Sequence, residues 1–284
     1  MTSRAHSGEL QPRSRGDGAL SLGWIGSRGP LSAQSLPLGL LAMAPLLAVY
    51  ELALLAVGSS ARNTSELVLF RLFAPLGDAA DLARWLALGA LMVTSLGYCL
   101  RRQWELGPRL LRIAAEGALG AVVLGPALLA ILALVGGGLA PPPIAPGEGG
   151  PHGSAPDLAR AAFVFGAGAY EELVFRVGIY SALFLVARRV TVFFGAGDVP
   201  SRAAGDVAGL VGSALLFSAF HLAVFVSWLG PGGEAFEASL FIYRALAGIL
   251  LGIVFRWRGP GVAAWTHGFY NLALLLGAGP HVFL

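Results

Sequence analysis

Polar side chains suited to hydrolysis recur at helical spacing inside stretches of this chain that are otherwise apolar. They form three short patterns, which are Glu171-Glu172-x-x-x-Arg176, Phe217-x-x-x-His221 and His267-x-x-x-Asn271. An ionisable group inside a bilayer is costly unless it is paired or hydrated, so carboxylates and imidazoles at that depth are candidates for function. The patterns therefore mark these residues as the candidate site.

The two adjacent glutamates predict a division of roles. Glu172 and Arg176 stand four residues apart, so on a helix they share a face and can form an ion pair. Glu171 points about 100° away around the helix axis and is not neutralised by this arginine. We expect Glu172 and Arg176 to form a structural pair and Glu171 to be the general base. The alternative is that both acids only lock helices together.

The two histidines complete a set of groups that can hydrolyse an amide. Phe217 and His221 share one helical face, and His267 and Asn271 share another. One acid and one histidine can activate a water, while the other histidine and the amide donate hydrogen bonds to an oxyanion.

A zinc site is the alternative interpretation of the same residues. Glu171, His221 and His267 would bind the ion and leave one coordination position open. The spacing itself does not separate zinc catalysis from metal-free catalysis. We favour a metal-free reaction without a cofactor, because Asn271 is a poor zinc ligand but a good hydrogen-bond donor to an oxyanion.

At these motifs the chain resembles the CAAX prenyl endopeptidase type II and bacteriocin-processing (CPBP) family of intramembrane proteases. The resemblance covers roughly residues 158–279. It implies that Glu171 activates the attacking water together with His221, and that His267 and Asn271 stabilise the oxyanion. Residues 1–150 carry no such resemblance, and their role is open.

Composition indicates a membrane protein. Of the 284 residues, 56% are hydrophobic and only 12% are charged, whereas a soluble domain has about 25% charged residues. The basic residues are all arginines, and they cluster between apolar stretches, where they orient membrane helices. The positive net charge therefore does not indicate a nucleic-acid partner.

Apolar stretches predict an all-α, polytopic membrane helix bundle with seven or eight transmembrane helices. A helix that crosses a bilayer needs roughly 20 apolar residues. The predicted spans are 36–57, 86–100, 113–135, 158–187, 206–229, 239–257 and 260–279. We expect four parts, which are a disordered cytoplasmic tail (1–35), a three-span region (36–135), a Gly/Pro-rich loop (136–157) and a four-span catalytic core (158–284).

The arginine distribution predicts a cytoplasmic N-terminus. The connection 58–85 departs from this rule, because it carries Arg62, Arg71 and Arg84 on the opposite side. A helix lying in the membrane interface over residues 67–76 would explain these charges. Glu51 and Glu116, which lie within predicted spans, are expected to be structural acids facing the bundle.

The sequence thus predicts an intramembrane endopeptidase of the bacterial inner membrane. Its substrate is expected to be a membrane-embedded or lipidated peptide or protein. A proton-coupled transporter is one alternative, since buried Glu, Arg and His also form proton relays, although no internal repeat supports it. A non-catalytic membrane scaffold is another. A protease requires Glu171, His221, His267 and Asn271 to converge on one water-accessible cavity.

Overall fold

The computed structural model describes residues 36–57, 62–136, 157–229 and 233–276. In these ranges the backbone forms helices and turns, with an isolated parallel bridge between Leu222 and Glu234. The expected tail (1–35) lies outside the described residues, and so does nearly all of the expected loop (136–157). The predicted all-α class is confirmed.

The first part of the chain contains more helices than the hydropathy pattern predicts. Its elements are α1 (Leu36–Val57), α2 (Thr64–Phe73), the 3-10 helix η2 (Ala74–Ala79), α3 (Ala80–Arg101) and α4 (Leu106–Gly136). Asn63 caps α2, because its side chain accepts a hydrogen bond from the backbone N–H of Ser65. Gly77 has a φ of 57° and turns the chain between α2 and α3. The helix expected over 67–76 therefore corresponds to α2 and the start of η2.

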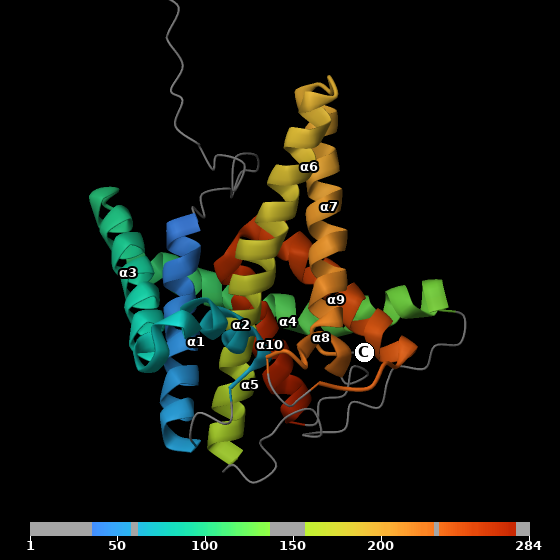
Figure 1. Cartoon of the computed structure of the whole chain (residues 1–284). Coiled ribbons are helices and arrows are strands. Elements are labelled where there is room, and N and C mark those ends of the chain that lie inside the picture. The colour runs from blue at the N-terminus through green and yellow to red at the C-terminus, as the bar shows by residue number, and fades with distance from the viewer. Residues whose placement is uncertain (1–35, 58–61, 137–156, 230–232, 277–284) are drawn as a thin grey trace, which may run out of the picture.

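The second part carries the predicted motifs. Its elements are α5 (Asp157–Glu172), the π-helical η3 (Leu173–Tyr180), α6 (Ser181–Phe193), α7 (Asp198–Ala219), α8 (Ala223–Val226), α9 (Ala238–Arg258) and α10 (Pro260–Leu275). The segments α5, η3 and α6 follow one another without a loop, so the helix expected over 158–187 continues to Phe193. The α6–α7 hairpin projects from one end of the bundle (Figure 1).

The expected helix over 206–229 is wrong in its second half. Helix α7 ends at Ala219, and His221 lies in the turn that follows. Leu222 is extended, and the backbone on either side of it bonds to Glu234: Glu234 N donates to His221 O at 2.8 Å and Ala223 N donates to Glu234 O at 2.9 Å. The segment after the turn remains apolar, so hydropathy gave no sign of this break.

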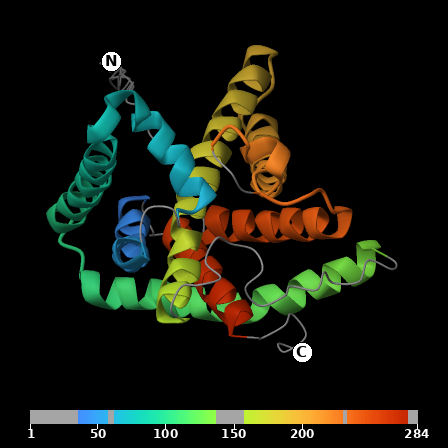
Figure 2. The same cartoon turned by 60° about the horizontal axis from the view of Figure 1, so that its bottom comes forward.

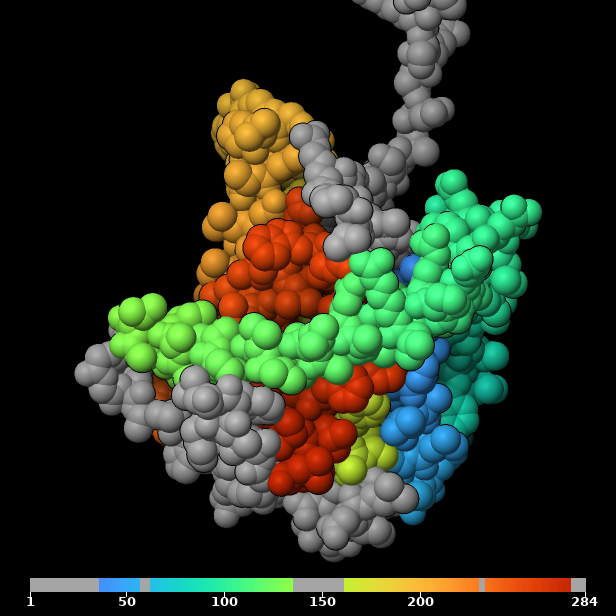
Figure 3. Space-filling view, turned by 180° about the vertical axis from the view of Figure 1, so that it is seen from behind, coloured from blue at the N-terminus to red at the C-terminus, as the bar shows by residue number. Residues whose placement is uncertain are grey.

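Helices α5 and α10 occupy the middle of the molecule, and α1 lies against both. Seen from behind, α4 runs across α10 and connects the two sides of the bundle (Figure 3). Figure 2 shows α9 directed away from α5 on the side opposite to α1 and α3. The first part of the chain therefore packs around the helices that carry the motifs.

The surface is that of a membrane protein. In the described residues, 4 helical segments are long and apolar enough to cross a membrane: Leu36–Ala56, Thr64–Arg101, Leu106–Leu134 and Ala238–Arg258. Large apolar side chains such as Leu52, Leu111 and Phe193 are exposed on these and neighbouring helices, which suits contact with lipid. The chain is a multi-pass helical membrane bundle, and the count of seven spans stays a prediction.

Candidate active site

His267 on α10 lies between the two glutamates at the end of α5. Its Nδ1 is 2.9 Å from Glu172 Oε1, and its Nε2 is 3.3 Å from Glu171 Oε2. All three side chains are buried. Two adjacent carboxylates thus approach opposite edges of one imidazole ring, so a proton on Nδ1 is donated to Glu172, while Nε2 faces Glu171.

Small residues bring α5 and α10 close enough for these contacts. A Cβ atom added to Gly168 would lie 3.2 Å from His267 Cβ, and one added to Gly268 would lie 2.6 Å from Phe165 O. Both helices therefore need glycine where they cross. This crossing fixes the separation between the carboxylates and the imidazole.

Arg176 forms the predicted pair with Glu172 and extends it to two further helices. Arg176 Nη1 lies 3.3 Å from Glu172 Oε1, and Nη2 donates to Gly248 O on α9 at 3.1 Å. The guanidinium also lies over the Phe217 ring, 4.9 Å from its centroid. Glu172 Oε1 therefore contacts both Arg176 and His267, which the expectation of a purely structural pair did not include.

Phe217 connects the two histidines. Its ring centroid is 5.0 Å from that of His221 and 5.8 Å from that of His267. The Nδ1 atom of His221 lies 2.9 Å from Phe217 O. Since a carbonyl only accepts, Nδ1 carries the proton, and Nε2 of a neutral His221 ring is unprotonated and can accept a hydrogen bond. The predicted proximity of Phe217 and His221 is confirmed, although His221 lies beyond the end of the helix.

The loop after α8 ties His221 to α9. Glu234, whose N–H bonds to His221 O, accepts two hydrogen bonds from the Arg244 guanidinium at 2.7 and 2.8 Å. Burial acts to raise the pKa of Glu234, but the hydrogen bonds and charge of Arg244 outweigh it, so this pKa lies below its usual value. Glu234 thus links the turn that carries His221 to α9: its backbone N–H bonds to His221, and its ionised carboxylate bonds to Arg244.

Asn271 has the fewest contacts with the other predicted site residues in the part of the chain that the structure describes. It follows His267 by one turn on α10 and is half-buried. In the part of the chain that the structure describes, its amide forms no hydrogen bond with the glutamates or histidines above. Its role remains the one that the resemblance implies.

The structure shows no preformed geometry for the alternative zinc site in the residues that it describes. In the described ranges, no group of three or more His, Cys, Asp or Glu side chains is arranged to hold a metal ion. This includes the set formed by Glu171, His221 and His267.

A further contact to Glu171 was not predicted. Asn63, the residue that caps α2, donates from Nδ2 to Glu171 Oε1 at 3.1 Å. The sequence Asn63-Thr64-Ser65-Glu66 resembles a helix-capping box, which would have located the start of α2. Nothing in that pattern connects it to a residue more than a hundred positions away.

Glu51 and Glu116 are paired as structural acids, as expected. Glu51 accepts hydrogen bonds from Arg84 at 2.6 and 3.1 Å, and Glu116 forms an ion pair with Arg258 at 2.5 Å. Each pair joins helices far apart in the sequence and so contributes to the bundle.

These features define a helical membrane protein with a buried glutamate–histidine site. The family model described as type II CAAX prenyl endopeptidase Rce1-like matches residues 156–273. That stretch contains every predicted motif, and the match supports an assignment to the CAAX protease (CPBP) family and a protease role. No curated protein and no solved structure matches the chain.

Proposed function

We propose that this protein is an intramembrane endopeptidase that hydrolyses a peptide bond of a membrane-associated protein or peptide. The observation that carries the proposal is the contact of one buried imidazole, His267, with both Glu171 and Glu172. An ion pair between Glu172 and Arg176 with a purely structural role would not require the Glu171 carboxylate on the opposite side of the His267 imidazole. The family match, which includes these residues, supports the same conclusion.

In the proposed reaction, Glu171 is the general base. It takes a proton from a water whose oxygen adds to the carbonyl carbon of the substrate, and the carbonyl oxygen becomes an oxyanion. His221 assists as a proton acceptor, a role supported by the contact of its Nδ1 with Phe217 O, which leaves Nε2 unprotonated in a neutral ring. When the carbon–nitrogen bond breaks, the proton held by Glu171 passes to the departing amine.

The proposed oxyanion donors are His267 and Asn271. Glu172 holds Nδ1 of His267, which leaves Nε2 directed toward Glu171 and the reacting atoms. A ring that carries a proton on both nitrogens donates a hydrogen bond from Nε2. Donors held in place before the reaction stabilise the developing charge without reorganisation.

The substrate is proposed to be a membrane-embedded or lipidated peptide. The matching family is described as a prenyl endopeptidase, so a peptide with a prenylated cysteine near its C-terminus is the first substrate to test. The same peptide without the lipid, and a membrane-inserted leader peptide, distinguish the other substrate classes.

The test uses the full chain reconstituted in lipid vesicles and mass spectrometry of the products. We expect cleavage of at least one of these peptides by the wild type. Glu171→Gln removes the base but keeps the volume, so it is expected to remain folded and to lose cleavage. A Glu171→Gln protein that cleaves at the wild-type rate would overturn the proposal.

We also propose a bacterial inner-membrane location with a cytoplasmic N-terminus. Two of the three arginines that depart from the positive-inside rule have acidic partners: Arg62 lies 2.6 Å from Asp81, and Arg84 lies 2.6 Å from Glu51. The third, Arg71, donates to the backbone carbonyl of Leu229 at 2.9 Å. Arginines that are paired inside the fold are poor markers of orientation. Arg62 and Arg84 therefore do not argue against a cytoplasmic N-terminus. Labelling of single cysteines placed near the N-terminus, with reagents that do not cross the membrane, tests the orientation.

A further inference from the structure

The proposed general base has a partner from outside the family-matched stretch. Asn63 Nδ2 donates to Glu171 Oε1 at 3.1 Å, while Glu171 Oε2 faces His267 Nε2 at 3.3 Å. The two oxygens of the carboxylate are therefore occupied from two sides, by a residue of the first part of the chain and by α10. The family model begins at residue 156 and does not include Asn63.

The orientation of the Asn63 amide is set by a second hydrogen bond. Its Oδ1 accepts from Ser65 N at 2.8 Å, and this bond caps α2. A rotated amide would place Nδ2 against the Ser65 N–H and Oδ1 against the Glu171 carboxylate, so both hydrogen bonds would be lost. The capping bond thus directs the amide N–H toward Glu171.

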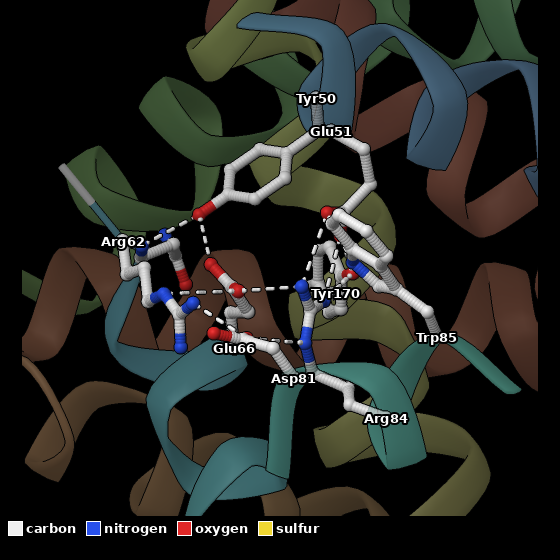
Figure 4. Close-up of polar contacts among 9 residues, drawn as sticks. Tyr50, Glu51, Arg62, Glu66, Asp81, Arg84, Trp85 and Tyr170 are labelled. Carbon is white, nitrogen blue, oxygen red and sulfur yellow. Dashed lines mark hydrogen bonds and ion pairs between the residues drawn. The ribbon is translucent and has the colours of Figure 1, made fainter. Parts of the chain in front are cut away.

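A buried polar network holds Asn63 itself in place. The Tyr50 hydroxyl on α1 accepts the Asn63 N–H at 2.6 Å and donates to Glu66 on α2 at 2.8 Å. Glu66 lies 3.3 Å from Arg84 on α3. The side chains of Glu66 and Arg84 are 0% and 1% exposed, and separating buried charges is costly. Figure 4 shows this network around the start of α2.

The same network reaches the residue next to Glu171. Arg84 donates to the Tyr170 hydroxyl at 2.6 Å, and that hydroxyl also donates to Glu51 (Figure 4). Tyr170 immediately precedes Glu171 on α5. Residues of α1 and α3 thus bind Tyr170 at the end of α5, and the N-cap residue of α2 binds the carboxylate of Glu171, the next residue.

We infer that Asn63 is a positioning residue for the proposed hydrolysis, with its amide fixing the rotamer of Glu171 so that Oε2 faces His267 and the water. This inference rests on the proposed role of Glu171 as the general base. It also gives residues 36–101 a function in the active site. A carboxylate displaced by about 1 Å can lose about 100-fold in rate, so one fixed hydrogen bond matters.

Three variants separate positioning from helix capping. Asn63→Ser and Asn63→Asp retain a good N-cap for α2, whereas Asn63→Ala loses it. All three lack the amide N–H that contacts Glu171. Asn63→Asp also brings a second carboxylate toward Glu171, so its loss is expected to be at least as large as that of Asn63→Ser.

The expected result is a fall in kcat of about 10- to 100-fold for Asn63→Ser, the range for one hydrogen bond to a charged group, with KM within about twofold and an unchanged melting temperature. Asn63→Ala should lose similar activity and also melt lower. If Asn63→Ser and Asn63→Asp keep the wild-type kcat and only Asn63→Ala is impaired, Asn63 is a capping residue alone and the inference is overturned.

The same assay distinguishes this failure from failure of the proposed function. A fully active Glu171→Gln protein would remove both proposals. An inactive Glu171→Gln protein beside a fully active Asn63→Ser protein would remove only the role of Asn63. A double-mutant cycle of Asn63→Ser with Glu171→Ala provides a readout without substrate: melting-temperature shifts that are not additive support the contact, and additive shifts overturn it.

Discussion

The variants Glu171→Gln and Glu172→Gln should differ in their effects: the first should lose cleavage but stay stable, and the second should lose stability. The side chains of Glu172 and Arg176 are both 0% exposed. Glu172→Gln removes the negative charge beside Arg176 and leaves a buried guanidinium without a counter-ion. Glu171, by contrast, contacts the neutral amide of Asn63, and a glutamine there keeps an oxygen that accepts the same hydrogen bond.

The magnitudes differ accordingly. Breaking a buried ion pair by removing one partner costs about 3–5 kcal/mol. At about 2–4 °C per kcal/mol for a chain of this size, Glu172→Gln should melt about 6–20 °C below the wild type. Glu171→Gln exchanges one hydrogen-bond acceptor for another and should cost below about 1 kcal/mol, although we expect it to abolish cleavage.

The measurement is the fraction of protein that stays monodisperse after heating in detergent, followed by size-exclusion chromatography. The double variant Glu172→Gln/Arg176→Met is the matched control. It removes both charges, and replacement of a buried pair by neutral side chains is often close to neutral. We therefore expect it to recover at least half of the lost melting temperature.

Two outcomes contradict this reasoning. If Glu172→Gln melts within about 2 °C of the wild type, Arg176 does not depend on Glu172 for its charge balance. If Glu171→Gln and Glu172→Gln lose equal stability, the two acids share a structural role, and the assignment of Glu171 as the base loses its support.

Further predictions concern the oxyanion, a metal and the helix crossing. Asn271→Ala should bind substrate normally but lose about 10²- to 10³-fold in kcat, and an unchanged kcat would remove Asn271 from the oxyanion site. Chelators should leave activity intact; their inhibition, reversed by zinc, together with about one ion per chain on elemental analysis, would show that zinc supplies the Lewis acid. Gly268→Ala places a Cβ 2.6 Å from Phe165 O and should lower both activity and melting temperature. Gly97→Ala on α3 has nothing within 4 Å of its Cβ and serves as the control, so equal effects of the two alanines would contradict the proposed close crossing.

Local spacing predicted the contacts that lie within one helix. The Glu172–Arg176 pair follows from a four-residue separation, and it forms even though η3 begins at Leu173. The approach of Phe217 to His221 follows from the same spacing, although the helix ends between them. Apolar composition predicted the bundle, because each membrane helix must satisfy its own backbone hydrogen bonds.

Contacts between distant helices could not be predicted in this way. Nothing in the spacing indicates that His267 contacts Glu172 as well as Glu171, because the crossing of α5 and α10 depends on small residues and on neighbouring helices. The end of α7 at Ala219 was missed since the following residues are equally apolar. The contact of Asn63 with Glu171 spans 108 positions and depends on the folded network around α2.

The place of α10 in the bundle has a consequence for biosynthesis. His267 lies on the last helix that the structure describes, and this helix packs against α1, α4 and α5, all of which leave the ribosome earlier. Glu172 and Arg176 are made together, so their charges are already matched when α5 enters the membrane. The imidazole arrives only when α10 inserts between its neighbours. A nascent chain therefore lacks one half of the proposed catalytic pair, and the proposed hydrolysis requires that this helix has been translated and inserted.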